Sequence, residues 1–233
     1  MKKLQQILRV ILPAVICLLP FSSAATTAAR ADNTDTVLDF SEQTHLVFIC
    51  EEEKLVRDVY RMLARRFPEV SVLADMEESQ EHNRCAVQEL LKKYRVSIPR
   101  VNDNVGVFSW GIYGRYFMEK YMVLTNQGSV SPLNALYVAA FMEELTIQEI
   151  TECPKVIVDI SNGIGDISAC GMRYTDNPDV RHIYDMLLES SRAHLRLLVG
   201  DIEQQTGTGT YQAQVLQQAD VERILSRQQL AQP

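Results

Sequence analysis

The fold is decided by the stretch ICEEEKLVRDVY, residues 49–60, which places three consecutive glutamates inside an amphipathic helical pattern. The apolar stripe of this helix is formed by Leu46, Ile49, Val56, Tyr60, Leu63 and Phe67, at three- and four-residue steps. At about 100° per residue, Glu52 falls near the middle of the stripe, Glu53 near one edge and Glu51 outside it. A carboxylate in a buried stripe needs a metal, a basic partner or a proton to offset its charge. Arg57, one turn after Glu53, offers the simplest alternative, an ion pair on a solvated shoulder of the helix.

Length and charge limit the classes of protein to consider. The chain has 233 residues, enough for one domain with a sizeable core. Its formal net charge is −7, which argues against a broad surface for nucleic acid. We therefore expect no nucleic-acid partner, whereas a protein partner stays open.

Residues 1–31 have the order of a secretory signal peptide. Two lysines precede an apolar run over residues 7–21, and small residues follow. The run is shorter than a membrane span of about 20 residues and is interrupted by prolines. The pattern predicts cleavage after Ala24 or Ala31, no stable membrane anchor afterwards, and an exported protein, periplasmic or extracellular. Residues 32–44 are mostly polar and predict a flexible segment.

Export makes the cysteines informative, because oxidising compartments favour disulfides. Without the cysteine of the leader, four cysteines remain and three pairings are open. We favour Cys50–Cys85, since an antiparallel helical hairpin that turns near Pro68 puts them at matching heights. We also favour Cys153–Cys170, which bracket one glycine-containing loop.

Periodicity predicts an all-α fold with four long amphipathic helices. Their expected ranges are residues 41–66, 72–95, 131–152 and 178–205, with Ser41, Ser131 and Asn177 as N-cap candidates. Between the second and third helices lies a long crossover, residues 96–130, with a short aromatic helix at 113–125. Such a crossover lets the second and third helices run parallel, as in one class of four-helix bundle.

The remaining segments connect or follow these helices. Residues 153–176 contain proline and glycines and predict a loop, with residues 156–158 as a short extended piece. The tail, residues 206–233, begins with a Gly-Thr-Gly-Thr turn and continues with an apolar pattern typical of a short final helix. We therefore assign the bundle to residues 45–205.

Polar residues lie on the apolar stripes of three of the four helices. Besides Glu52 and Glu53, Glu143 falls within the stripe of the third helix, Glu144 at its flank, and His194 at the centre of the fourth. Ferritin-like metal centres are built this way, with a glutamate from each of two helices and Glu-x-x-His from each of the other two. Carboxylate oxygens with an imidazole nitrogen suit iron, manganese or zinc.

A set of short motifs runs in order along residues 45–225. These are Glu51-Glu52-Glu53-Lys54-Leu55, Arg57-Asp58-Val59-Tyr60, Gly128-Ser129-Val130-Ser131, Glu143-Glu144-Leu145, Tyr184, Leu187-Leu188, Ser191-x-x-His194-Leu195 and Tyr211-Gln212-Ala213-Gln214. In their order and spacing the chain resembles exported ferritin-like domains of unknown function, a family distantly similar to rubrerythrins. The resemblance implies a ferritin-like bundle that can carry a metal centre, and it implies no established activity.

The second helix departs from that family. Its members usually carry Ser-Glu-x-x-His before an apolar run, whereas this chain has Ser79-Gln80-x-x-Asn83. Neutral amides are poor ligands for transition metals. The neighbouring His82 does not replace the missing histidine, because one residue turns a helical side chain by about 100°.

In the fourth helix, Ser191 stands where ferritins place a glutamate, although the resembled family often has serine there. The predicted metal ligands therefore shrink to Glu52 or Glu53, Glu143 and His194. Three ligands can hold one metal ion with open positions, but they are too few for an intact two-metal site.

Two functions follow from this set. The first is a metal-binding ferritin-like domain with oxidative or peroxide-linked chemistry. The second is a non-catalytic bundle that serves as a partner-binding or structural protein of the envelope. In that case Gln80, Asn83 and Ser191 would hydrogen-bond with Glu143 and His194 without metal. The sequence leaves open whether the protein is an enzyme.

Overall fold

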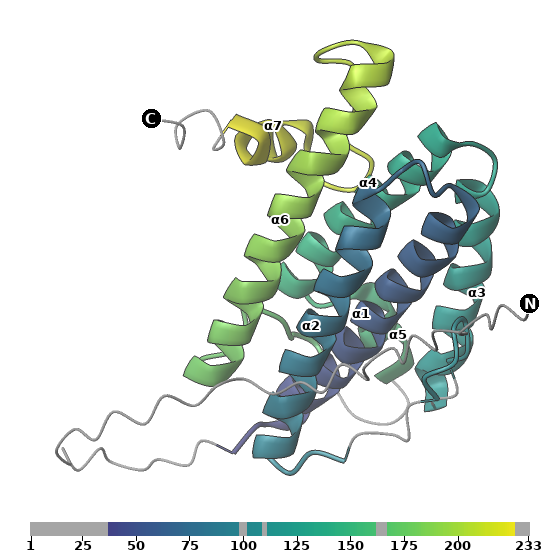
Figure 1. Ribbon diagram of the computed structural model, residues 1–233. Helices are drawn as coiled ribbons and strands as arrows, with labels where there is room; N and C mark the ends of the chain where they lie inside the picture. Colours follow the sequence, from purple (N-terminus) through teal and green to yellow (C-terminus); the bar gives the residue numbers. More distant parts are fainter. Residues whose placement is uncertain (1–36, 98–101, 109–110, 162–166, 227–233) are drawn as a thin grey trace, which may run out of the picture. The chain divides into compact units, whose positions relative to one another are not determined.

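The structure is helical, as the sequence predicts. The computed structural model describes residues 37–97, 102–108, 111–161 and 167–226, and these ranges contain seven α-helices and no strand (Figure 1). The helices are α1 (Phe40–Arg66), α2 (Val72–Lys93), α3 (Gly111–Gly128), α4 (Pro132–Thr151), α5 (Lys155–Ser161), α6 (Pro178–Thr206) and α7 (Gln218–Ser226). The predicted signal peptide lies outside the described residues. Among the described helices, none has the length and apolar character needed to cross a membrane.

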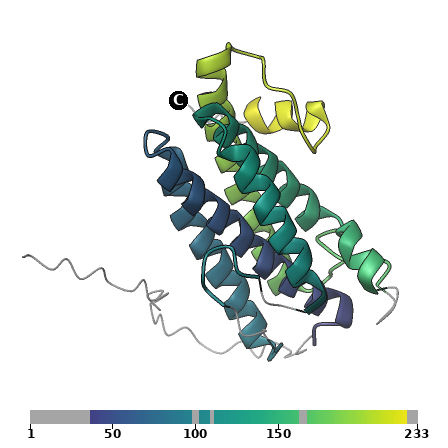
Figure 2. The same ribbon diagram turned by 90° about the vertical axis from the view of Figure 1, so that its right-hand side faces the viewer.

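Four of the longer helices pack in pairs, and α3 covers two of them. α1 packs against α2, α4 against α6, and α2 also against α6, while α3 lies on both α1 and α4 (Figures 1 and 2). The two short helices, α5 and α7, lie towards opposite ends of the long helices (Figure 2). The predicted crossover therefore contributes a full-length helix to the packing.

Two contacts fix the direction of α4 relative to α1. His45, near the start of α1, contacts the backbone oxygen of Glu149, near the end of α4, and Tyr60, further along α1, contacts Glu143. The two helices are therefore antiparallel, and the middle of α1 lies level with the second half of α4. Because α1 and α2 form an antiparallel hairpin, α2 and α4 run in the same direction, as the crossover predicts.

The apolar stripe predicted for the first helix is buried. Leu46, Ile49, Val56, Tyr60 and Leu63 are all at most 2 % exposed. Aromatic residues of α3 cover the neighbouring line of α1, for instance Phe117, whose ring centroid lies 5.0 Å from that of Phe48. Packing against α1 explains this aromatic cluster.

Side-chain caps start three of the helices. Ser131 and Asn177 cap α4 and α6 as predicted, each followed by proline at the start of the helix. The predicted cap Ser41 is wrong, because Asp39 caps α1 and forms a capping box with Glu42. The helix consequently includes residues 40–44, part of the segment predicted to be flexible.

The loop before α6 also differs from its prediction. Residues 156–158, expected to be extended, lie in the helix α5, and Ile157 is fully buried. A helix buries Ile157 while its own backbone hydrogen bonds are satisfied, which an isolated extended segment could not achieve. At the end of the chain, the short helix predicted from the apolar pattern is α7.

One of the two predicted disulfides forms. Cys153 and Cys170 are bonded, with Cα atoms 4.6 Å apart. The Cys50–Cys85 pairing is wrong, because Cys50 is a buried free thiol. Its neighbours on α2 are Arg84 and Gln88. Cys50 of α1 therefore lies level with residues 84–88 of α2, as predicted. Cys85, however, points about 100° away from Arg84 around the helix axis and so does not face Cys50.

Candidate functional site

A cluster of polar side chains occupies the middle of α1, α2, α4 and α6. We call it the central cluster, and its members are Glu53, Tyr60, Ser79, Gln80, Asn83, Glu143, Ser191 and His194. Each element presents its member from the buried side of a helix, so the apolar stripes of the four helices bring them together. All except Ser79 are at most 7 % exposed.

Glu143 is the hydrogen-bonding centre of this cluster. Its Oε1 accepts hydrogen bonds from the Tyr60 hydroxyl at 2.5 Å, Gln80 Nε2 at 3.2 Å and His194 Nδ1 at 3.1 Å. Three donors aimed at one oxygen stabilise a negative charge on this fully buried carboxylate. Burial, reinforced by the charge of Glu143, raises the pKa of Tyr60 well above its usual range, so this hydroxyl keeps its proton and acts as a donor.

Glu53 is buried beside Glu143, but no hydrogen-bond donors in the described part of the chain stabilise its carboxyl group in the way they stabilise that of Glu143. Neither of its carboxyl oxygens has a hydrogen-bond partner within the described residues. Burial and the charge of Glu143 raise the pKa of Glu53 to about 8, and the nearby Asn83 offsets only part of this rise. At neutral pH, Glu53 therefore holds a proton.

His194 links the cluster to the partly buried side. Its Nδ1 donates to Glu143, because a carboxylate can only accept, and its Nε2 then accepts from the Ser79 hydroxyl at 3.0 Å. One turn earlier on α6, the buried Ser191 hydroxyl has no partner among the described residues. The imidazole thus has both ring nitrogens engaged.

Gln80 and Asn83 of α2 stand where the resembled family carries a glutamate and a histidine. Gln80 donates to Glu143, and Asn83 Nδ2 donates to Gln80 Oε1 at 3.3 Å. His82 is exposed, with its Nδ1 2.9 Å from the backbone oxygen of Glu78. The prediction that His82 does not enter the site is therefore confirmed.

Glu52 does not join the central cluster. It interacts directly with Glu149 of α4, and burial together with the charge and the hydrogen bond of Glu149 raises its pKa well above the usual range. The sequence placed Glu52 and Glu53 together as alternatives for one site. The step of about 100° between adjacent residues instead sends them to different neighbours.

The four predicted ligands thus divide into three that meet and one that does not. Glu143 and His194 are in contact and Glu53 lies beside them. Across the described residues, no three His, Cys, Asp or Glu side chains are arranged closely enough to hold a metal ion. The cluster has suitable donor types but not a closed ligand shell.

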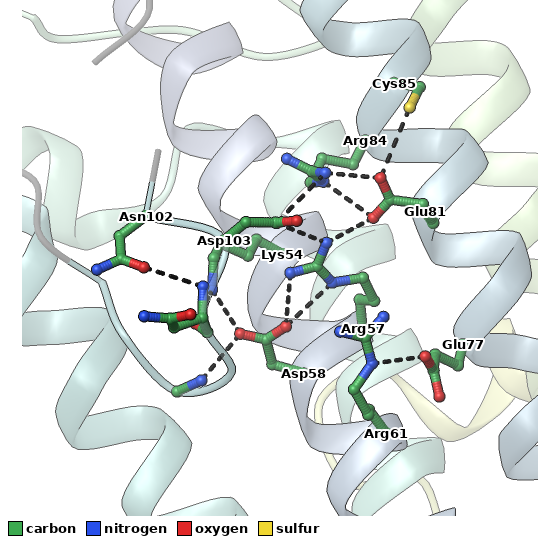
Figure 3. A network of polar contacts seen from close by, with 12 residues as sticks. Lys54, Arg57, Asp58, Arg61, Glu77, Glu81, Arg84, Cys85, Asn102 and Asp103 are labelled. Carbon is green, nitrogen blue, oxygen red and sulfur yellow. Dashed lines mark hydrogen bonds and ion pairs between the residues drawn. The ribbon is translucent and has the colours of Figure 1, made fainter. Parts of the chain in front are cut away.

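A second polar network lies on another face of α1 (Figure 3). Lys54 and Arg57, each 1 % exposed, both bind the fully buried Asp58, at 2.5 and 2.8 Å. Arg57 also pairs with Glu81 of α2 at 2.6 Å and with Asp103 of the crossover at 3.0 Å. The alternative of an ion pair between Arg57 and Glu53 is wrong, since the guanidinium turns towards Asp58, Glu81 and Asp103 instead.

This network, which we call the charge network, holds part of the crossover against α1. Asp58 Oδ2 accepts the backbone N–H of Gly106 at 3.0 Å, and Lys54 donates to the backbone oxygen of Asn104 at 3.1 Å. Gly106 has a φ of +73°, and a Cβ there would lie 2.5 Å from the Tyr121 ring. Only glycine fits this close approach without strain.

Comparison with known proteins shows the family to which the chain belongs. The family model described as "Uncharacterized protein domain (DUF2202)" matches residues 42–228. The chain belongs to the DUF2202 family. The match begins inside α1 and ends just after α7, so it covers both the central cluster and the charge network of this DUF2202 domain.

A relative with a solved structure supports the helical fold. The uncharacterized protein MJ0754 of Methanocaldococcus jannaschii is 30 % identical over 185 residues, which span 79 % of this chain and 86 % of the relative. The crystal structure of hypothetical protein MJ0754 aligns with a TM-score of 0.65 and 29 % identity, and covers 88 % of this chain and 98 % of that one. Its name states no function.

The sequence did not predict the role of Glu144, which holds the C-terminal tail of the DUF2202 domain against α4. Glu144, predicted at the flank of its helix, is fully buried and binds the tail. Its carboxylate accepts the Tyr211 hydroxyl at 2.6 Å, and it accepts the backbone N–H groups of Gln214, Val215 and Leu216 at 2.7 to 3.2 Å. The Glu143-Glu144 and Tyr211–Gln214 motifs were both visible, but nothing in the sequence connected them.

Proposed function

We propose that the chain is an exported ferritin-like domain whose four-helix bundle, made of α1, α2, α4 and α6, binds one transition-metal ion. Glu53, Glu143 and His194 would hold the ion. The observation that carries the proposal is the carboxyl group of Glu53, which is buried beside Glu143 with both oxygens unused. A buried carboxyl without partners is costly, and a bound cation would remove that cost.

The donor set favours one ion of iron, manganese or zinc. Two carboxylates and one imidazole suit these metals, and water or a substrate oxygen would fill the open positions. A second ion would need the Glu-x-x-His ligands that ferritin-like sites draw from two helices. Gln80 and Asn83 of α2 and Ser191 of α6 do not supply them. A metal with open positions could supply Lewis-acid or one-electron chemistry.

Metal uptake should displace the proton of Glu53. In this proposal the cation takes over the role of the proton in offsetting the charge, so binding releases protons and tightens as the pH rises towards 8. His194 would contribute Nδ1, which now donates to Glu143. Glu53 would also have to close on the other two ligands, since no closed three-residue shell exists among the described residues.

The test measures bound metal and released protons with Fe²⁺ under anaerobic conditions, and with Mn²⁺ and Zn²⁺. We expect one ion per chain for the wild type, and none for the double variant Glu143→Ala/His194→Ala. The matched control is His82→Gln, which removes an exposed histidine of α2 and should bind like the wild type. Equal metal contents for wild type and double variant would remove the proposal.

The second candidate is a non-catalytic bundle with a partner-binding or structural role in the envelope. It is favoured by the three hydrogen bonds on Glu143 Oε1 and by the engagement of both His194 nitrogens. A network satisfied in this way stabilises a specific core without metal. Protein partners of such a bundle would bind its outer surface.

The double variant Gln80→Glu/Asn83→His tests whether the cluster is the remainder of an ancestral metal site or has a purely structural role. Both side chains are buried and face the central cluster, so the exchange restores the carboxylate and imidazole that the resembled family carries there. A gain of metal affinity would indicate that an ancestral site remains. Unchanged affinity in a folded double variant would count against that ancestry and favour the purely structural role.

A further inference from the structure

A second pair of buried acids lies between α1, α3 and α4, outside the central cluster. Glu52 is 2 % exposed and Glu149 8 % exposed, and their carboxyl groups contact each other. One oxygen of each, Oε2 in both cases, is buried without a hydrogen-bond partner among the described residues. The pair therefore holds two buried carboxyl oxygens that no hydrogen bond from the described residues satisfies.

A neutral oxygen lies beside the pair and is also unused. Thr146 is 1 % exposed, and its Oγ1 has no partner in the described part of the chain. Thr146 precedes Glu149 by one turn of α4, so the two side chains are neighbours on the helix. Since Glu149 contacts Glu52, its neighbour Thr146 on the same buried face of α4 lies close to the acid pair. Because Thr146 carries no charge, its unsatisfied hydroxyl is evidence for a ligand that is independent of the acids.

A partly exposed ammonium, that of Lys120, lies beside the acid pair. Lys120 of α3 is 22 % exposed, and its Nζ lies 3.6 Å from Glu149 Oε1 and 4.7 Å from the centroid of the Tyr116 ring. The Tyr116 hydroxyl lies 3.5 Å from the same carboxyl oxygen. Tyr116 and Lys120 also line a groove of about 650 Å³ between α3 and α4, which opens to solvent. The groove gives the Lys120 side chain room outside the acid pair.

We propose that Glu52, Glu149 and Thr146 form a site for a hard divalent cation, of the class of Ca²⁺ or Mg²⁺. All of its ligands are oxygens, which these ions prefer, and it lacks the imidazole that distinguishes the central cluster. Lys120 is its tethered competitor and offsets part of the charge when the cation is absent. The site is separate from Glu53, Glu143 and His194 and does not depend on metal in the central cluster.

Terbium luminescence tests the proposal, because Tb³⁺ replaces hard cations at oxygen sites and is sensitised by a nearby tyrosine. We expect the purified protein to give a saturable terbium signal on tyrosine excitation, with one ion per chain, that excess Ca²⁺ reverses. Glu149→Gln should weaken binding by roughly tenfold or more, and Thr146→Val, which changes no charge, should weaken it less. Lys120→Met should tighten it, because the competing ammonium is gone.

Two further variants decide where the ion sits. Glu119→Gln removes an exposed acid from the same groove and should leave the signal unchanged. A signal lost in Glu143→Gln but kept in Glu149→Gln would overturn the proposal, because the ion would then occupy the central cluster. The absence of a saturable signal, or a Lys120→Met variant that binds no more tightly than the wild type, would overturn it as well. The lysine variant keeps both acids and so serves where Glu149→Gln fails to fold.

Discussion

The charge network and the central cluster are two buried polar regions on neighbouring faces of α1, and they differ in how completely their charges are paired. Lys54 and Arg57 both bind Asp58, and the three residues also contact Glu81 of α2 and backbone groups of the crossover. Glu53, by contrast, has no hydrogen-bond partner in the described residues. The same helical segment thus carries one region whose charges are paired and one that contains a carboxyl group unsatisfied by the described residues.

The comparison teaches that burial alone does not mark a functional residue. Lys54 and Asp58 are as buried as Glu53, yet their charges are neutralised on site. An unpaired buried carboxyl keeps its desolvation cost, and proteins retain such groups where binding or chemistry needs them. Mutations should therefore have opposite effects on stability in the two regions.

The largest effect is expected from Asp58→Ala, which leaves the buried ammonium of Lys54 and part of the Arg57 guanidinium without their carboxylate. Removing one side of a buried ion pair destabilises a protein by about 3–5 kcal/mol, and here the N–H of Gly106 also loses its acceptor. Urea unfolding would measure the loss. A double variant, Lys54→Met/Asp58→Leu, removes both charges and should cost clearly less. A double variant as unstable as Asp58→Ala would show that the shape of the network matters more than its charge balance.

His45 is a buried polar residue whose uncharged ring has a hydrogen-bond partner at both nitrogens. Its Nε2 donates to the Glu149 backbone oxygen at 2.8 Å, so Nδ1 accepts from the Tyr184 hydroxyl at 2.5 Å. Burial lowers the pKa of His45 to about 4, although the hydrogen bond to Glu149 opposes this. The unfolded chain binds a proton near pH 6.5, so the folded state loses up to about 3 kcal/mol as the pH falls from 6.5 to 4.

The His45 prediction is measured as the difference between wild type and His45→Gln in urea unfolding at pH 7 and near pH 4.5. Glu52 and Glu53 have raised pKa values and change stability with pH in the opposite direction, but they contribute to both proteins alike. The advantage of the wild type should shrink at the lower pH. A constant difference would mean that His45 does not titrate as its burial requires.

In the central cluster, Glu53→Gln should raise the free energy of unfolding, by about 1 kcal/mol. The amide cannot become charged, and its N–H groups can donate to Glu143 Oε2, which has no partner among the described residues. The same variant should lose the metal uptake proposed above, as expected where function and stability oppose each other. A loss of stability similar to that of Asp58→Ala would show that Glu53 stabilises the fold, as the residues of the charge network do.

The sequence predicted well what depends on local signals. The bounds of α2, α4 and α6 follow from apolar periodicity and from the caps Ser131 and Asn177, which act within one turn. The grouping of Glu143 with His194 could also be foreseen, because both lie at the centre of an apolar stripe that must face the other helices.

What the sequence missed depends on partners far along the chain. Glu144 is buried because backbone N–H groups of the tail converge on it, some 70 residues later. Arg57 turned from Glu53 to Glu81 and Asp103 because only the folded crossover brings Asp103 to it. The separation of Glu52 from Glu53 likewise depends on Glu149 and Lys120, which no pattern within α1 can reveal.

The smallest effect should come from Arg61→Ala, which tests whether burial sets the strength of the charge network. Arg61 pairs with Glu77 at 2.6 Å across the same two helices, but both side chains are about a quarter exposed. Water and salt screen such a pair, so its loss should cost less than about 1 kcal/mol and less still at high salt. The distance matches that of Arg57 with Glu81, so geometry is held nearly constant while burial of the arginine changes. If Arg61→Ala were as damaging as Asp58→Ala, the contrast between the two regions of α1 could not rest on desolvation, and the number of ion pairs between α1 and α2 would be the better explanation of stability.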